Sequence, residues 1–362
     1  MNFQMANKEI IIINDIKNLT NFDYQNLVGQ YIDYLKKKPF VRAVYQIGAV
    51  NDPGISDFDL VVVVDKCNDP LKMNELSILQ AQGNDALKYI VFHDIYLYDC
   101  ESFEDFHYTN YCNSMELLHG ISQPVREINR SEIIPLSVQI IFDFISSRLV
   151  QFQNFLATGR LSLRGILVRI YSIKHSYMLL RNLGLENQEV LKFIERVKHL
   201  RENLDNIDSQ TVLNLFLESF FQFSRIVWMA AKYFSERFLL FHSAIEPSNC
   251  LKLNQNFNLK FVDCTPDIYR SVKNETMIYY PEEVFYHYHA YTNCSNLIAE
   301  KAKYYISCSG NESYDLIQEY TEVLQKRLDA ISNHFEFLKK NRAYYAMKGN
   351  PGFTVNYNDI NI

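Results

Sequence analysis

The sequence predicts an α+β fold: an N-terminal α/β unit with a short mixed sheet, then a helical bundle, then a small β-containing region that ends in a long helix. Three observations support this prediction. Helical and strand-like apolar patterns alternate over the first third of the 362 residues, helical patterns without proline fill the middle, and the pattern changes again after Pro247. Because 48% of the residues are hydrophobic, the chain has enough apolar surface to exclude a disordered protein.

The first third predicts alternating helices and strands. In chain order, we expect a helix over 20–37, strands over 41–48 and 57–65, a helix over 70–82 and a strand over 89–99. The strand over 57–65 contains an unbroken run of valines, which is typical of a central strand buried on both faces. This order of elements indicates a compact α/β unit.

The middle of the chain predicts a helical bundle, because long apolar-periodic stretches follow one another there with little glycine. The expected helices cover 136–157, 162–182, 187–203 and 210–236. Beyond this bundle, the alternating and aromatic-rich stretches predict two or three strands within 251–291, followed by an amphipathic helix over 312–341. We therefore expect an α/β domain over 1–125, a helical domain over 135–245, a mixed C-terminal region over 246–345 and a loose tail over 346–362.

Composition narrows the class of protein. With 36 Lys and Arg against 42 Asp and Glu, the formal charge is −6, which argues against a protein that coats nucleic acid. The seven cysteines are odd in number and form no C-x-x-C, so we expect reduced thiols rather than a disulfide framework. No apolar run approaches the roughly 18 residues of a membrane span. We expect a cytoplasmic protein without membrane association, and its oligomeric state stays open.

One segment carries candidate chemistry. Residues 48–60 run from Gly48 through a short loop into Asp57-Phe58-Asp59 at the start of the valine strand. Because side chains alternate along a strand, both aspartates project from one face, about 6–7 Å apart. Two carboxylates this close repel each other unless a cation lies between them, and such oxygen ligands suit Mg²⁺. The alternative interpretation is a pair of solvated aspartates at a strand end.

This segment resembles the signature of the polymerase-beta-like nucleotidyltransferase superfamily, of the type that acts on small molecules. In that family a Gly-Ser turn precedes a strand bearing Asp-x-Asp, and a neighbouring strand adds a third carboxylate. The order of elements over residues 20–100 also matches the family's minimal catalytic unit. Asp94 is the candidate third carboxylate, and Asp99 is the second choice. An acidic residue in so apolar a strand needs a partner, which is either a metal or the backbone of a helix or loop.

The resemblance implies a function for these residues. Asp57, Asp59 and Asp94 would hold two Mg²⁺ ions, with Mn²⁺ as the other possible ion, and these would bridge the triphosphate of ATP or another nucleoside triphosphate. Asp94 would also help to deprotonate the acceptor hydroxyl, which attacks the α-phosphate and expels pyrophosphate. Residues 1–125 would then be the catalytic domain. The acidic charge balance favours a hydroxyl or phosphate of a small molecule as acceptor.

Further residues are expected around the phosphates. Gly48 would let the backbone approach the phosphates closely, with Ala49 beside it. Ser56 would either add a hydroxyl beside the metal ions or be an ordinary turn residue. In the helical domain, Arg164 and Lys174 share a helix face and would either reach the phosphates or form a solvated basic face.

The two histidines of Tyr-His-Tyr-His, His287 and His289, have no third ligand at a recognisable spacing, so we interpret them as half-buried strand residues. His93 adjoins Asp94 and is expected to point to the opposite face of the strand.

Two other functions stay open. Ala49 stands where the family usually has Ser or Gly, and the loop before Asp57 is short, so a catalytically inactive nucleotide-binding or regulatory module is one alternative. The other is a nucleotidyltransferase that acts on protein or tRNA. The patterns G-x-S-x-G, Walker A, G-x-G-x-x-G and H-E-x-x-H are absent from the sequence, so no other chemistry is indicated.

Overall fold

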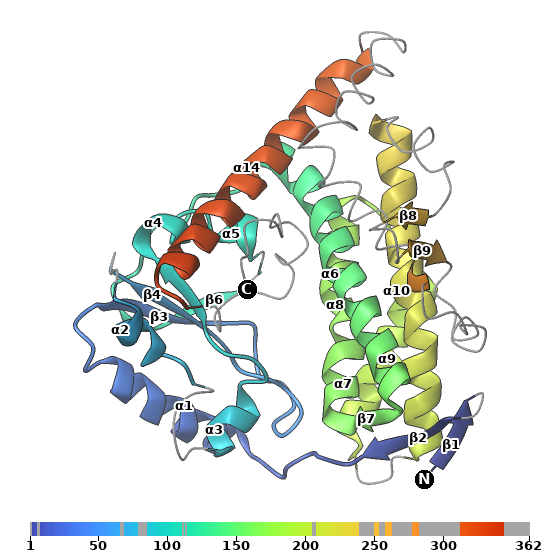
Figure 1. Cartoon of the computed structure of the whole chain (residues 1–362), viewed down its shortest axis with the longest axis horizontal. Helices are drawn as coiled ribbons and strands as arrows, with labels where there is room; N and C mark the ends of the chain where they lie inside the picture. The colour runs from blue at the N-terminus through green and yellow to red at the C-terminus, as the bar shows by residue number, and fades with distance from the viewer. Residues whose placement is uncertain are drawn as a thin grey trace. The chain divides into compact units, whose positions relative to one another are not determined.

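The structure of the chain is a computed structural model (Figure 1). It describes residues 2–5, 8–65, 69–78, 85–110, 112, 114–204, 208–238, 250–252, 258–262, 277–281 and 312–343. The chain divides into two compact units, each built from two stretches of sequence: unit 1 comprises Met1–Asp15 and Arg130–Leu324, and unit 2 comprises Ile16–Asn129 and Gln325–Ile362. The mixed α+β character that the sequence predicts is confirmed.

The described part of unit 2 is built around a mixed four-stranded sheet with the order β5-β4-β3-β6. Its strands are β3 (Val41–Ile47), β4 (Asp59–Val64), β5 (Tyr96–Asp99) and β6 (Met115–Gly120). Strand β3 is antiparallel to β4 and to β6, whereas β4 and β5 are parallel. The predicted valine strand is confirmed as β4, an inner strand whose residues 60–64 are all buried.

Helix α1 (Asn21–Leu35) covers one face of this sheet. Thr20 and Asp23 form a capping box at its N-terminus, which satisfies backbone N–H groups that the helix leaves unbonded. The buried residues of α1 recur every three or four positions and pack with alternate residues of β4; they are Tyr24, Val28, Tyr31 and Leu35. On the same face lie α2 (Pro70–Asn74) and α3 (Asp85–Ile90), which add Met73, Leu87 and Ile90 to the core.

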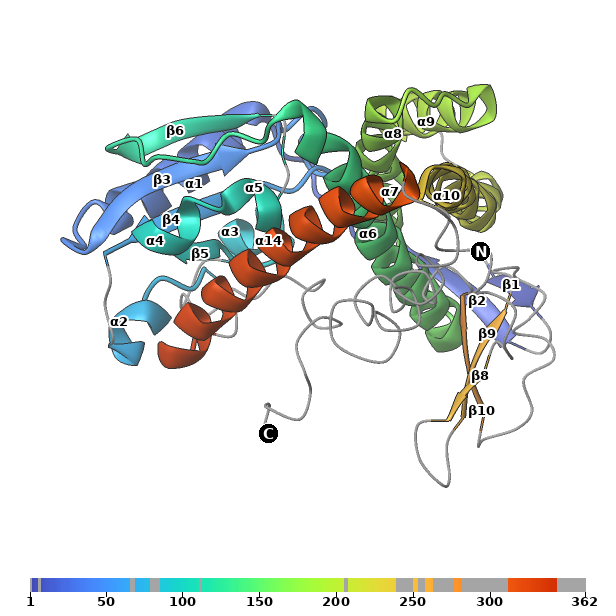
Figure 2. The same ribbon diagram turned by 90° about the horizontal axis from the view of Figure 1, so that it is seen from above.

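The other face of the sheet packs against α4 (Cys100–Phe103) and α5 (Phe106–Thr109), whose Phe103 and Phe106 contact Val61 and Val63 of β4. The C-terminal part of α14 (Glu312–Lys340) also belongs to unit 2 (Figure 2). There the His334 ring stacks on Tyr98 of β5 with a centroid separation of 4.0 Å. The sequence assigned this helix to a separate C-terminal region, whereas the structure assigns its last turns to the α/β unit.

The connection between β4 and β5 differs from the predicted one. A strand was expected over 89–99, but α3 continues to Ile90, residues 91–95 form a bend followed by irregular backbone, and β5 begins only at Tyr96. The physical reason lies in Asp94, whose carboxylate accepts hydrogen bonds from the backbone N–H groups of Ile78 and Ile95. A side chain that bonds the backbone in this way competes with the strand ladder.

Unit 1 contains the helical bundle that the sequence predicts. Its helices are α6 (Arg130–Thr158), α7 (Leu163–Tyr171), α8 (Ile173–Asn182), α9 (Gln188–Glu202) and α10 (Ser209–Phe238). The single helix expected over 162–182 is divided at Ser172. An aromatic core joins α6 to α10, since the ring of Phe152 lies 5.2 to 5.5 Å from those of Phe216, Phe220 and Phe223.

Two small sheets complete the described part of unit 1. One contains β1 (Asn2–Met5), β2 (Lys8–Ile13) and β7 (Arg160–Ser162), in the order β1-β2-β7. The other contains β8 (Cys250–Lys252), β9 (Asn258–Val262) and β10 (Met277–Pro281), in the order β10-β9-β8. The expected domain over 1–125 therefore begins differently, because its first 15 residues belong with the helices. Most of 246–311 and the tail over 346–362 lie outside the described residues.

None of the helices in the described ranges combines the length and apolar character that a bilayer crossing requires.

Candidate metal centre

Three segments of unit 2 meet at one end of its sheet. In the β3–β4 pair, Ile47 lies opposite Asp59, so Gly48 follows β3 at the end where β4 begins. In the parallel β4–β5 pair, Val61 lies opposite Tyr96, the first residue of β5, so the turn before β5 also reaches this end. The topology thus brings together the Gly48 turn, the first residues of β4 and residues 91–95.

The loop that leads into β4 is held by buried hydrogen bonds. The Tyr24 hydroxyl of α1 donates to the Ser56 carbonyl at 2.6 Å and accepts from the Gly54 N–H at 3.1 Å. The Tyr89 hydroxyl of α3 donates to the Gly54 carbonyl at 2.6 Å. Because the backbone on its N-terminal side is fixed to two helices, Asp57 leaves this loop in a defined direction.

Asp57, Asp59 and His93 bring a carboxylate oxygen each and an imidazole nitrogen within 4.8 Å of one another. Within the described ranges, this is the one group of three or more such residues close enough to share a metal ion. All three side chains are partly exposed, so an ion has access from solvent. His93 Nε2 lies 2.7 Å from Asp59 Oδ1.

The orientation of the His93 ring is fixed by its other nitrogen. Nδ1 lies 2.6 Å from the backbone carbonyl oxygen of Asp94, and because a carbonyl only accepts, Nδ1 must carry the proton. Nε2 then faces Asp59, and the Tyr96 hydroxyl lies 3.0 Å from it. Nε2 is thus the ring nitrogen that faces the two carboxylates; it carries a proton in the imidazolium form and offers a lone pair to a metal ion once that proton has left.

The charges of the group favour a cation. Burial opposes a charged His93, but the hydrogen bond and charge of Asp59, the Asp94 carbonyl and the charge of Asp57 outweigh it and raise the pKa of His93 to about 9. Asp59 Oδ1 is buried and lies 2.7 Å from His93 Nε2. Two carboxylates this close to each other, with an imidazole beside them, fit a site for a positively charged ligand.

Asp94 does not join this group. Its side chain is buried, and its carboxylate accepts hydrogen bonds from Ile78 N at 2.9 Å, Ile95 N at 2.8 Å and the Ser77 hydroxyl. The predicted third metal ligand is thus a carboxylate bonded to loop backbone, the other interpretation that the sequence allowed. The second choice, Asp99, is the N-cap of α4 and accepts from Ser102 N at 2.9 Å.

His93 belongs to this group, although the sequence predicted that it would lie outside it. It was expected to point away from the carboxylates because side chains alternate along a strand. Residues 91–95 form a bend and irregular backbone rather than a strand, so that rule does not apply to them. One signal could have shown this: Asp85-Ala-Leu-Lys-Tyr-Ile90 has an acidic first residue and a basic last turn, which is typical of a short helix immediately before His93.

The glycine turn and its neighbours lie beside the group. Gly48 has φ of 73°, a conformation that favours glycine, and nothing lies within 4 Å of where a Cβ would be. Ala49 is exposed at the same end of the sheet. The Ser56 hydroxyl is buried and accepts from Asp52 N at 3.2 Å, so it takes part in closing the loop. Gly48 and Ala49 thus border open space, whereas Ser56 serves the turn.

The cations predicted to reach the phosphates belong to unit 1. Arg164 is buried, and its backbone N–H donates to Asp15 Oδ1 at 3.0 Å. Lys174 Nζ lies 4.2 Å from the ring centroid of Tyr171, a cation–π contact. Each side chain thus has a place within its own bundle. His287 and His289 lie outside the described residues.

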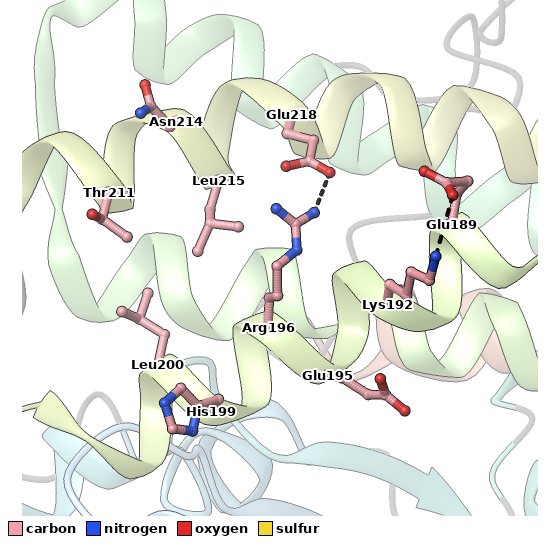
Figure 3. Close-up of a pocket in the computed structure, with 10 residues that line it drawn as sticks. All are labelled: Glu189, Lys192, Glu195, Arg196, His199, Leu200, Thr211, Asn214, Leu215 and Glu218. Atoms are coloured by element: carbon pink, nitrogen blue, oxygen red, sulfur yellow. Dashed lines mark hydrogen bonds and ion pairs between the residues drawn. The ribbon is translucent and has the colours of Figure 1, made fainter.

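A separate open groove lies between α9 and α10 of unit 1 (Figure 3). Its lining residues are Glu189, Lys192, Glu195, Arg196, His199, Leu200, Thr211, Asn214, Leu215 and Glu218. Two ion pairs are formed there: Arg196 bonds Glu218 across the groove, and Lys192 Nζ lies 3.8 Å from Glu189 along α9. None of the predicted site residues lines the groove, and exposed ion pairs of this kind indicate no particular chemistry.

Comparison of the chain with protein-family models, with curated proteins and with solved structures finds no match. The function is therefore inferred from the residues and their geometry.

Proposed function

We propose that unit 2 is a divalent-metal-dependent nucleotidyltransferase domain that transfers a nucleoside monophosphate from a nucleoside triphosphate to a hydroxyl or phosphate of a small molecule. The observation that carries this proposal is the Asp57–Asp59–His93 group at the start of a buried inner strand. The order of the elements α1, β3, β4, α2, α3 and β5 also supports it, since it differs from the order to which the resemblance points only in having two short helices between β4 and β5.

The residues would divide the work as follows. Asp57 and Asp59 would hold the cation, and the turn at Gly48, with open space around its Cα, would receive the β- and γ-phosphates close to the backbone. A bound divalent cation supplies charge neutralisation at the triphosphate and orients the acceptor for in-line attack. The hydrogen bonds from Tyr24 and Tyr89 would keep the loop before Asp57 from moving as charge shifts.

The reaction forms one bond and breaks one. An acceptor oxygen bonds to the α-phosphorus, the bond from this phosphorus to the β-bridging oxygen breaks, and pyrophosphate leaves with the electron pair. A hydroxyl acceptor gives up its proton to solvent, because Asp94 is occupied by its hydrogen bonds; a phosphate acceptor is already ionised at neutral pH. The formal charge of −6 favours a small acceptor over an RNA.

Pyrophosphate release by the full chain tests this proposal. The protein is incubated with each nucleoside triphosphate, with Mg²⁺ or Mn²⁺, and with a metabolite fraction below about 1 kDa as the acceptor source. Asp57→Asn and Asp59→Asn each remove one carboxylate charge and should lower release by about 10²-fold or more, the loss expected when one electrostatic partner of the transition state is removed. Far-UV circular dichroism confirms that each variant is folded.

Asp33→Asn is the matched control. It makes the same chemical change on the exposed surface of α1, where Asp33 pairs with Lys36, and it should leave the rate unchanged. If protein or tRNA becomes labelled when it replaces the metabolite fraction, the nucleotidyltransferase activity is retained and the proposed small-molecule acceptor is wrong. Release that survives both active-site substitutions would contradict the proposal.

A second candidate is a nucleotide-binding module without catalysis. The observation that favours it is Asp94, which supports the fold instead of the site and so leaves the group one carboxylate short of the family's set. Such a module would show a metal-dependent thermal shift with a nucleoside triphosphate but no pyrophosphate release. A shift together with release would exclude it.

A further inference from the structure

We propose that the group at the start of β4 binds a transition-metal cation of the Mn²⁺ or Zn²⁺ kind in preference to Mg²⁺, with Nε2 of His93 as a metal ligand beside Asp57 and Asp59. The proposal rests on the metal-binding part of the function proposed above. It departs from the carboxylate set that the resemblance implies, because the third donor in this structure is a nitrogen.

The first support is the state of the imidazole. Its Nδ1–H donates to the Asp94 carbonyl at 2.6 Å, which leaves Nε2 as the donor atom that faces the carboxylates. Metal-binding histidines commonly give their second N–H to a backbone carbonyl or a carboxylate, which fixes the ring and makes it a better ligand. The ring is also braced by Tyr96, whose centroid lies 4.8 Å away.

The second support is the anchoring of this arrangement in the fold. The Asp94 carbonyl that orients His93 belongs to a residue whose side chain is bound on three sides, by Ser77, Ile78 and Ile95. Asp94 is therefore a positioning residue: it holds the turn that presents Nε2. The acid that the sequence assigned to the metal thus supports the ligand that replaces it.

The third support is the chemistry of the donor set. Mg²⁺ takes oxygen ligands almost exclusively and keeps several waters, whereas Mn²⁺, Co²⁺ and Zn²⁺ accept imidazole together with carboxylates. Two carboxylates and one imidazole give a neutral complex with a divalent cation before substrate binds. The buried Oδ1 of Asp59, 2.7 Å from His93 Nε2, is one of these donor atoms.

Direct metal-binding measurements test the proposal without any assay of activity. Full-length protein is titrated at fixed pH with Mn²⁺, Zn²⁺ or Mg²⁺, and pulsed electron paramagnetic resonance of the Mn²⁺ complex reports whether a ¹⁴N nucleus is directly bound. We expect a nitrogen coupling in the wild type and at least about tenfold tighter binding of Mn²⁺ than of Mg²⁺. His93→Gln should remove the coupling and weaken Mn²⁺ by about tenfold or more, but weaken Mg²⁺ far less.

His119→Gln is the matched control, since His119 lies on β6 of the same unit, outside the group, and its loss should change neither affinity nor coupling. Mn²⁺ binding without nitrogen coupling in the wild type would overturn this inference and leave the nucleotidyltransferase proposal standing. Coupling at His93 without pyrophosphate release under any condition would support the inference and refute the proposed function. If no divalent cation binds, the His93 imidazolium is itself the cation of the site, and the inference fails.

Discussion

The start of β4 and the turn before β5 each present an aspartate, and the two aspartates have opposite surroundings. Counting back two residues from the Val61–Tyr96 pair places Asp59 level with Asp94 on the neighbouring segment. Asp94 is buried and bound by neutral donors of the loop, whereas Asp59 is partly exposed and lies against an imidazole. The comparison teaches that the groups which satisfy a carboxylate, more than its position in a pattern, decide whether it supports the fold or binds a ligand.

The largest expected effect is the loss of stability on substitution, which differs between the two aspartates. Asp94→Ala would leave two buried N–H groups and a hydroxyl without their acceptor and should lower the free energy of unfolding by about 3 kcal/mol. Asp94→Asn keeps an amide oxygen for the N–H groups and should cost about 1 kcal/mol or less. Urea unfolding of metal-free protein measures both. An Asp59→Ala variant that lost as much as Asp94→Ala would break the comparison.

The next effect distinguishes the two aspartates by the stability that a bound metal ion adds. At an Mn²⁺ concentration about 100 times the dissociation constant, binding to the folded state should add about 2.7 kcal/mol to the stability of the wild type. Asp94→Asn should keep this gain, because its carboxylate is not among the donor atoms, and Asp59→Asn should lose it. Urea unfolding with and without Mn²⁺ gives the difference. Loss of the gain in a folded Asp94→Asn protein would show that Asp94 is a ligand after all.

A smaller effect concerns pH in metal-free protein. The pKa of His93 rises from 6.5 to about 9 in the fold, so its ion pair stabilises fully below about pH 6.5 and is lost as pH rises through 9. A shift of this size corresponds to about 3 kcal/mol, but the side chain is 40% exposed and solvent screens it, so we expect about 1 kcal/mol. The difference in unfolding free energy between wild type and His93→Gln, measured from pH 6 to 10, should shrink accordingly; a constant difference would contradict the pairing.

The smallest effect is of opposite sign and comes from His107 of α5. Burial lowers the pKa of His107 below its usual 6.5, so its contribution to stability is present above that pH and is lost as pH falls. Histidine ring signals in an NMR titration of metal-free protein should therefore show His107 losing its proton before His93 as the pH rises. Equal midpoints would mean that Asp59 and Asp57 do not hold the proton on His93.

Much of the fold could be predicted from local patterns. The periodic apolar positions of α1 and the valine run of β4 follow directly from burial on one face or on both, and most of the bundle follows from the long apolar-periodic stretches after Pro135. The division of the chain could not be predicted in the same way. Strand β2 pairs with β7, about 150 residues later, and Tyr98 stacks on His334; no local pattern encodes contacts at such separations.

The candidate site was predictable in its oxygen donors but not in its nitrogen. Asp57 and Asp59 were found because their spacing and the strand after them are local features. His93 was missed because its direction depends on where α3 ends and on how the Asp94 side chain binds Ile78, sixteen residues earlier in the chain. Both depend on tertiary contacts, which here outweigh the strand propensity of a run of aromatic and aliphatic residues.

The last turns of α14 have a consequence for how the chain is made. Phe337 and Leu338 belong to the same apolar core as α1 and β4, yet Gln325 is synthesised long after Asn129, because unit 1 interrupts unit 2. At a ribosomal rate of about 5–20 residues per second, the intervening segment takes roughly 10–40 s to emerge. For that interval, nascent unit 2 exposes the apolar surface that these turns will cover, and it completes its core only after the last turns of α14 have emerged.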